Sequence, residues 1–253
     1  METNATEGTF AGKLESLGGF LFRWRGILPW LLPILFWKVF LLPEYLELTH
    51  GELVQDAYEF LCVSLSVIGL IVRFIIRGRV PPGTSGRDTK GPKAEVLNTD
   101  GFYSVVRHPI YVLGNFPIFL GLLLFTEIWW VIVPGIVLFW LYYIPIMKAE
   151  DAFLKERFGE KWRMWAAKTP LILPNLKGWQ PFSGPFSWRR AIRKEYTTIF
   201  VIVGLYAMID AFRDLLTEGE YDGFWIILLT LSGCAYAVIR FLKKHTTLLK
   251  DPH

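Results

Sequence analysis

The sequence predicts an all-α fold: a polytopic membrane bundle of about six transmembrane helices, including one tight helical hairpin, together with cytoplasmic interfacial helices. Apolar residues make up 53% of the 253 residues and aromatic residues 16%, which is too apolar for an ordinary soluble domain. Apolar runs of about 20 residues use up most of the chain, so we expect a single membrane domain over residues 1–253. Basic residues gather in alternate connections between these runs, as they do in multi-pass membrane proteins.

Six apolar runs account for the predicted spans. By residue number they are 27–42, 58–76, 110–125, 128–147, 197–216 and 223–242. Several are near the lower length limit for crossing a bilayer. Their prolines are compatible with membrane helices, because neighbouring groups satisfy the carbonyls that proline leaves without an intrahelical partner. Only Thr126 and Glu127 separate the third run from the fourth, which predicts a tight helical hairpin.

The connections between the spans differ in charge. Connections 43–57 and 217–222 contain acidic residues but no Lys or Arg, and the hairpin tip carries only Glu127. Connections 77–109 and 148–195 and the C-terminal tail are rich in Lys and Arg. Because Lys and Arg are retained on the cytoplasmic side, we expect a multi-pass integral membrane protein with both termini cytoplasmic. We favour a bacterial cytoplasmic membrane over the endoplasmic reticulum.

An arginine and a histidine open the third span, and two adjacent acids follow the fourth. Arg107 and His108 precede Pro109, which suits the first turn of a helix, and the amino end of a helix attracts anions. Glu150 and Asp151 come directly after the fourth span. Because the hairpin is short, we expect all four charged side chains on one side of the bilayer, in one pocket. The alternative is that they form ordinary interfacial salt bridges, and composition alone leaves both open.

Other ionisable residues lie in or beside spans: Lys38, Arg73, Asp210 and Arg213. We expect structural roles for them. Long cationic side chains such as Lys38 and Arg73 extend along the helix and place their charges at the interface. Arg213 is expected to pair with Asp210 or Asp214 on one face of its helix.

The two long basic connections differ in predicted structure. Residues 78–101 are rich in Gly, Pro and Thr, which is typical of a loop, and their hydroxyls and cations, Arg87 among them, suit a phosphate or carboxylate headgroup. The alternative is a solvated basic loop attracted to anionic lipids. Residues 148–175 begin as a continuation of the fourth span and carry aromatic residues such as Trp162 and Trp165, typical of a helix at the membrane interface.

Two motifs frame the predicted hairpin. They are RHPIY at 107–111 and EDAFLKERFGEKWRMWAAKTPLILP at 150–174, with the lead-in LNTDGFYSVVRHP from residue 97. Together they resemble the signature of the isoprenylcysteine carboxyl methyltransferase family and of its phospholipid methyltransferase relatives. That signature has Arg-His-Pro-x-Tyr-x-Gly, then Glu-Glu-x-x-Leu, Phe-Gly and two spaced aromatic residues before a proline-containing segment.

The resemblance implies an integral membrane methyltransferase that uses S-adenosylmethionine. Its core and cofactor pocket would lie in residues 77–175, after two spans in 27–76 and before an interfacial segment and two spans in 176–253. The implied roles are catalysis for Arg107 and His108, and cofactor binding for His108, Tyr111, Gly114, Glu150 and Asp151; to these we add Arg87 and Arg107 as candidate substrate-binding residues. No metal site is predicted, because the two cysteines show no CxxC or Cys/His ligand spacing.

Two positions depart from the signature. Asp151 stands where the family has a second Glu, which shortens the side chain by one methylene. Gly114 comes one residue later than the signature's glycine, and Leu113 holds the expected position. One residue turns a helix by about 100°. Either the start of the helix contains an extra residue, or Gly114 does not approach the cofactor.

The predicted reaction is methyl transfer to a lipophilic acceptor, a lipid or a prenylated molecule that enters from the bilayer. An anionic carboxylate or phosphate acceptor needs positioning and exclusion of water but no general base, which favours it. The alternatives are an amine-directed phospholipid N-methyltransferase and, from other classes, a transporter or a membrane scaffold. A transporter is disfavoured because the charges lie at one membrane face and no inverted repeat is visible. We expect no nucleic-acid partner.

Overall fold

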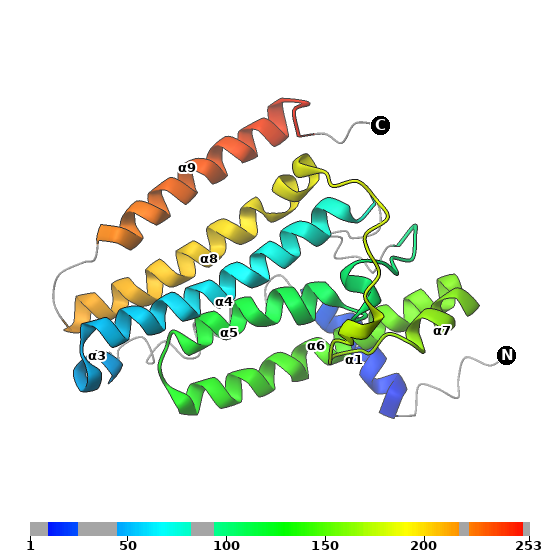
Figure 1. Ribbon diagram of the computed structural model, residues 1–253, viewed down its shortest axis with the longest axis horizontal. Helices are drawn as coiled ribbons and strands as arrows, with labels where there is room; N and C mark the ends of the chain where they lie inside the picture. Colours follow the sequence, from blue (N-terminus) through cyan, green and yellow to red (C-terminus); the bar gives the residue numbers. More distant parts are fainter. Residues whose placement is uncertain (1–9, 25–44, 82–93, 218–222, 250–253) are drawn as a thin grey trace. The chain divides into compact units, whose positions relative to one another are not determined.

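Every regular element that the computed structural model describes is helical (Figure 1). The described residues are 10–24, 45–81, 94–217 and 223–249. Their helices are α1 (Phe10–Trp24), α3 (Tyr45–His50), α4 (Glu52–Arg79), α5 (Phe116–Leu124), α6 (Trp129–Phe158), α7 (Glu160–Ala166), α8 (Trp188–Thr217) and α9 (Gly223–His245). This confirms the predicted all-α fold.

Four of the described helices are long and apolar enough to cross a membrane: α4, α6, α8 through Phe212, and α9. They correspond to the second, fourth, fifth and sixth predicted spans. The third predicted span is a shorter apolar helical stretch, Ile110–Leu124. The first predicted span, 27–42, lies outside the described residues. The protein is therefore an integral membrane protein with several helical spans.

The observed helices extend beyond the apolar runs that predicted them. α4 begins at Glu52 instead of 58, and α8 begins at Trp188 instead of 197. Glu, Arg, Lys and Gln are good helix formers, so polar ends continue a helix whose apolar middle crosses the membrane. Hydropathy locates the apolar middle of such a helix and not its ends.

The helices belong to two compact units. The first contains α1, residues 80–112 and residues 136–184, which include most of α6 and all of α7. The second contains α3, α4, residues 113–135, α8 and α9.

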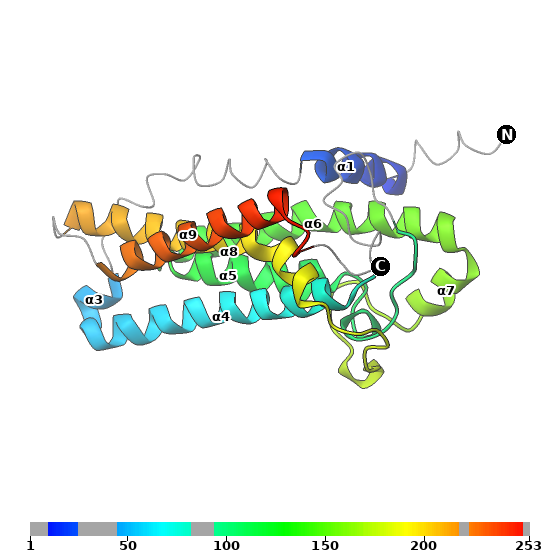
Figure 2. The ribbon, with the colours of Figure 1, turned by 90° about the horizontal axis from the view of Figure 1, so that it is seen from above.

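In the second unit, α4, α5, α8 and α9 run side by side (Figures 1 and 2). α4 packs against both α5 and α8, and α9 packs along α8. Three buried rings connect these helices: Phe125 meets Tyr206 edge to face at 4.9 Å between centroids, and Tyr206 stacks on Trp225 at 5.5 Å. Such rings bury a large apolar area in a defined geometry, which fixes how the helices pack.

Small residues and hydrogen bonds bring α4 and α5 close together. Ser66 Oγ donates to the carbonyl of Ile118 at 3.0 Å and lies 2.8 Å from the hydroxyl of Tyr206. A Cβ on Gly69 would lie 2.5 Å from the carbonyl oxygen of Gly114. Contacts of this kind hold helices together in a membrane, where lipid tails remove the hydrophobic driving force between helices.

Arg73 has the structural role expected for it, but its charge is bound inside the second unit instead of lying exposed along the helix. Its Nε and Nη2 donate to the two carboxylate oxygens of Glu195 at 3.0 and 2.9 Å. Asn115 and Thr198 accept further hydrogen bonds from its guanidinium. Glu195 is 122 residues away in sequence and 1% exposed, and helical periodicity within α4 cannot indicate so distant a partner. Lys38 and the side chain of Arg213 lie outside the described residues.

In the first unit, α6 continues well past the predicted end of the fourth span, as the sequence predicts, and ends at Phe158. Gly159 follows with φ of +54°, a left-handed conformation that glycine adopts without strain, and α7 begins at the next residue. α1 packs closely on α6. Gly18 permits this approach, since a Cβ at this position would collide with the carbonyl of Pro145.

The helix after Pro109 begins as a π-helix, Ile110–Asn115, and continues as α5. A π-helix bonds residue i to i+5, so each of its turns contains about one residue more than an α-helical turn. The structure thus contains the extra residue that the late position of Gly114 requires. Gly114 itself lies against α4, where a Cβ would be 2.5 Å from Arg73 Cγ.

Candidate active site

The first unit contains a cluster of four charged side chains. Arg107 and His108 lie just before the π-helix, and Glu150 and Asp151 lie on α6. Arg107 Nη1 is 2.5 Å from Asp151 Oδ2, and His108 Nε2 is 3.0 Å from Asp151 Oδ1. His108 Nδ1 is 3.2 Å from Glu150 Oε2, so this imidazole bridges the two adjacent acids. The structure brings the Arg-His and Glu-Asp pairs together, as their positions at the ends of the hairpin predict.

His108 is the most buried member of the charged cluster, with 5% of its side chain exposed. Burial alone would lower its pKa, but the hydrogen bonds that His108 donates to Asp151 and Glu150, together with their two negative charges, outweigh burial and raise the pKa of His108 to about 9. His108 is therefore protonated at neutral pH, and both ring nitrogens are donors. The charged cluster then contains two cations and two anions.

Aromatic rings border the charged cluster. Tyr111 donates its hydroxyl hydrogen to Glu150 Oε1 at 2.6 Å. Its ring packs on Tyr143 at 5.0 Å between centroids, and Tyr143 packs on Phe139 at 4.4 Å. Tyr143 and Phe139 were not among the predicted site residues. Helical spacing could have indicated them, because they lie seven and eleven residues before Glu150 on α6 and therefore on the same helix face.

The segment after α7 holds the backbone next to the charged cluster. The Arg107 N–H donates to the carbonyl of Pro170 at 2.9 Å. On α7, the indole N–H of Trp165 donates to the carbonyl of Tyr103 at 2.9 Å. The indole N–H of Trp165 is therefore bonded within the first unit. The sequence pattern indicated a tryptophan at the membrane interface and did not indicate this contact. Both contacts fix the segment that presents Arg107 and His108.

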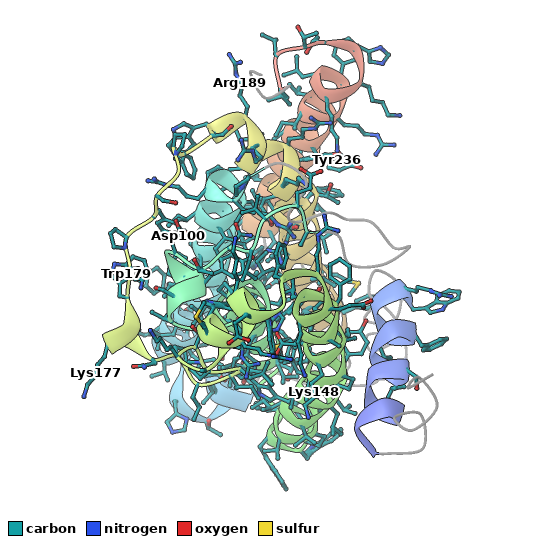
Figure 3. All side chains as sticks on the ribbon, turned by 90° about the vertical axis from the view of Figure 1, so that its right-hand side faces the viewer. Asp100, Lys148, Lys177, Trp179, Arg189 and Tyr236 are labelled. Atoms are coloured by element: carbon teal, nitrogen blue, oxygen red, sulfur yellow. The ribbon has the colours of Figure 1, made fainter. Side chains whose placement is uncertain are left out.

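Further along, residues 176–184 are tied to residues 100–104. The Gly101 N–H donates to the carbonyl of Gln180 at 2.9 Å, and the Ser183 N–H and hydroxyl donate to Asp100 Oδ2 at 2.7 and 2.5 Å. Figure 3 shows Asp100 and Trp179 on these two segments. The contacts tie the residues before Arg107 to the end of the first unit at several points, so Arg107 is presented from a braced segment instead of a free loop.

The remaining predicted site residues have separate outcomes. Arg87 lies outside the described residues. Gly114 packs on α4, and its cofactor role stays a prediction. Among the described residues, no group of three or more His, Cys, Asp or Glu side chains could hold a metal ion.

Together, the fold and the charged cluster define a class of protein: a multi-pass helical membrane protein in which two basic side chains meet two acids on α6, a helix long enough to span the bilayer. Residues 59–161 match the family model of phospholipid methyltransferases, and this range contains the whole charged cluster. Over this region the chain is similar to the phospholipid methyltransferases, the relatives that its two motifs resemble.

The chain is also similar to a protein whose name refers to metal resistance. The cobalt-zinc-cadmium resistance protein CzcN of Cupriavidus metallidurans is 30% identical over 125 residues, which are 48% of this chain and 56% of that protein. The chain thus spans little more than half the length of the curated relative that it matches. No solved structure matches the chain.

Proposed function

We propose that the protein transfers a methyl group from S-adenosylmethionine to the anionic carboxylate or phosphate of a membrane-embedded lipid or prenylated acceptor. The observation that carries the proposal is the charged cluster of Arg107, His108, Glu150 and Asp151, which lies inside the region that matches a methyltransferase family. Both termini are proposed to be cytoplasmic, because the basic connections 77–109 and 148–195 would then face the cytoplasm.

The side chains present suit S-adenosylmethionine chemically. When bound, this cofactor supplies a methyl group on a sulfonium centre. The guanidinium of Arg107 suits its carboxylate. Glu150 and Asp151 suit its ammonium group and ribose hydroxyls. The rings of Tyr111 and Tyr143 offer flat apolar faces of the kind on which an adenine stacks.

The protonation of His108 favours an anionic acceptor. A pKa of about 9 keeps His108 protonated at neutral pH, so it is poorly suited to remove a proton from an amine. Glu150 already accepts hydrogen bonds from His108 and Tyr111, and Asp151 accepts them from His108 and Arg107. An acceptor that is already an anion needs no base, and the charged cluster then contributes by binding and orienting.

An amine-directed phospholipid N-methyltransferase is the second candidate. The observation in its favour is the description of the matching family, which names phospholipids as what it methylates. In this case one of the two carboxylates, not His108, would be the group available to take the amine proton.

Calorimetric titration of the purified full-length chain with S-adenosylmethionine tests the proposal. We expect one binding site, and binding of adenosine at least about tenfold weaker, because adenosine lacks the groups that the four charges suit. A folded, monodisperse sample that binds no S-adenosylmethionine would contradict the enzyme proposal and favour a transporter or scaffold.

A labelling experiment distinguishes the acceptors. Membranes containing the protein are incubated with cofactor labelled in the methyl group, and the lipids are extracted. Label in lipid that mild alkali releases as methanol indicates a carboxyl methyl ester. Label that resists alkali and remains on a phospholipid amine indicates N-methylation. Label found only in water-soluble products would rule out a lipid acceptor.

A further inference from the structure

Basic and aromatic side chains follow one face of α8 in the second unit. They are Arg189, Arg193, Tyr196 and Phe200, spaced four, three and four residues apart. Residues at this spacing share one face of a helix. The two arginines come first, so they lie at the end of α8 where the helix begins. Figure 3 shows Arg189 projecting from this end.

A matching face follows α9. It contains Tyr236, Arg240 and Lys243, spaced four and three residues apart, and these residues lie towards the end of the helix. α9 contains no Asp or Glu at all. The ionisable side chains in its C-terminal part are therefore all basic.

Stacked rings join the two faces. Tyr236 stacks on Tyr196 with centroids 5.3 Å apart and on Phe200 with centroids 5.0 Å apart. This pairing places the start of α8 and the end of α9 at the same end of the second unit, as Figure 1 shows for the two helices. The arginines of α8 and the cations of α9 therefore belong to one surface. We call it the α8–α9 basic surface, defined by Arg189, Arg193, Arg240, Lys243 and the rings of Tyr196 and Tyr236.

The cations of α9 are positioned by rings, not by carboxylates. Lys243 Nζ lies 5.2 Å from the centroid of the Tyr196 ring. Arg240 Nη1 donates to the hydroxyl of Tyr236 at 2.9 Å, and its guanidinium is 5.9 Å from that ring. A cation–π contact orients a cation but leaves its charge in place. The surface thus holds orientated positive charge, in contrast to Arg73, whose charge Glu195 balances.

The position of the α8–α9 basic surface at the ends of two membrane-spanning helices indicates the kind of molecule that it would bind. Both helices are long and apolar enough to cross a membrane, so their ends lie at the level of lipid headgroups. Exposed apolar side chains also occur near this end of the two helices: Trp188 is 66% and Phe241 60% exposed. A surface with cations at its end and apolar side chains beside them fits a molecule with an anionic head and apolar tails.

We propose that the α8–α9 basic surface binds an anionic phospholipid, with the headgroup phosphate held by Arg240, Lys243 and the α8 arginines. The acyl chains lie against the apolar residues beside them. α8 and α9 lie outside residues 59–161, so the proposed lipid site shares no residue with the charged cluster and does not depend on the proposed reaction.

Native mass spectrometry of the full-length chain in detergent tests the proposal. Phosphatidylglycerol, which is anionic, and phosphatidylcholine, which is zwitterionic, are titrated separately, and bound lipids are counted. We expect phosphatidylglycerol to bind more tightly. The double variant Arg240→Gln/Lys243→Gln should weaken phosphatidylglycerol binding about tenfold or more, because each cation near an anionic headgroup contributes measurably to binding.

The control variant Lys161→Gln/Lys177→Gln removes the same charge from exposed positions in the first unit and should bind phosphatidylglycerol like the parent protein. A second variant, Arg189→Gln/Arg193→Gln, removes cations from the other helix and should weaken binding in the same direction. Equal binding of the two lipids, or an equal loss in the control variant, would overturn the proposal. So would a dimer that the Arg240→Gln/Lys243→Gln variant converts to monomer with no change in lipid binding, because the surface would then join two copies of the chain.

Discussion

The two units each contain a cluster of arginine and carboxylate side chains, and the clusters differ in burial. In the second unit, Glu195 is 1% exposed, and two nitrogens of Arg73 bind its two oxygens. In the first unit, Glu150 and Asp151 expose 20% and 11% of their side chains, and each is bound by more than one partner. The same types of charged side chain thus occur in a closed and in a partly open arrangement.

The difference separates structural from binding roles. The pair of Arg73 and Glu195 joins two membrane-spanning helices, and removal of either partner leaves a buried charge. The charged cluster of the first unit retains contact with solvent, so its carboxylates can exchange a cationic side chain for a cationic ligand at a lower desolvation cost. Burial, more than residue type, distinguishes the two clusters.

The largest expected effect tests the structural side of this comparison. Glu195→Ala leaves the buried guanidinium of Arg73 without its carboxylate, and we expect a loss of about 3–5 kcal/mol in the free energy of unfolding. Thermal unfolding in detergent measures it. Glu160→Ala is the control, because its ion pair with Arg163 is exposed on both sides and is worth little. A Glu195→Ala protein as stable as the control would show that the buried pair is not what holds α4 to α8.

The second prediction tests the binding side. Glu150→Ala or Glu150→Gln should weaken S-adenosylmethionine binding at least about hundredfold, because a charge-assisted hydrogen bond to the ligand is lost, while expression and folding stay unchanged. Calorimetric titration measures the affinity. Glu156→Gln on the same helix removes an exposed charge and should bind like the parent protein. Unchanged affinity in the Glu150 variants would place the cofactor elsewhere.

The third prediction concerns pH. The pKa of His108 is raised in the folded protein to about 9 from a usual value of 6.5, so the folded state holds the proton more tightly. The resulting stability is complete below about pH 6.5 and is lost as pH rises through about 9, at most about 3 kcal/mol. Between pH 6.5 and 9.5 the melting temperature should therefore fall more for the parent protein than for His108→Gln. An equal fall in both proteins would show that the two acids do not hold the proton on His108.

The smallest expected effect concerns Tyr111. Tyr111→Phe removes the hydroxyl that donates to Glu150 at 2.6 Å but keeps the ring against Tyr143. We expect a loss of about 1 kcal/mol, or about fivefold in cofactor affinity, since one hydrogen bond is lost while another partner still binds Glu150. Titration under the conditions used for the Glu150 variants measures it. A loss as large as that of Glu150→Ala would mean that the hydroxyl itself meets the ligand.

Local sequence patterns predicted much of the fold. Apolar runs located four helices that the structure describes as long enough to cross a membrane, and the position of Glu150 and Asp151 after the fourth run predicted their proximity to Arg107 and His108. In both cases the signal lies within one helix or across one short hairpin, where chain connectivity limits the possible arrangements.

Long-range contacts could not be predicted in this way. The partner of Arg73 is on a helix more than a hundred residues away, and nothing near Arg73 in sequence indicates it. Trp165 donates to the main-chain carbonyl of Tyr103. Every residue has such a carbonyl, so the residue type at 103 does not reveal the contact. Such contacts depend on which helices pack together, and a single sequence does not encode that choice in a readable pattern.

The π-helix at Ile110–Asn115 has a consequence for how this chain tolerates change. The extra residue shifts the helix face on which all later side chains lie by one residue. The spacing rule that relates two positions on one face therefore does not apply across the π-helix. An ungapped alignment of the glycine would shift Gly114 by one column, although the chain remains helical there. Deletion of Leu113 would place the glycine two residues after Tyr111, as in the signature. It would also rotate the residues before the deletion by about 100° about the helix axis relative to those after it. In this helix, insertion and deletion matter more than substitution.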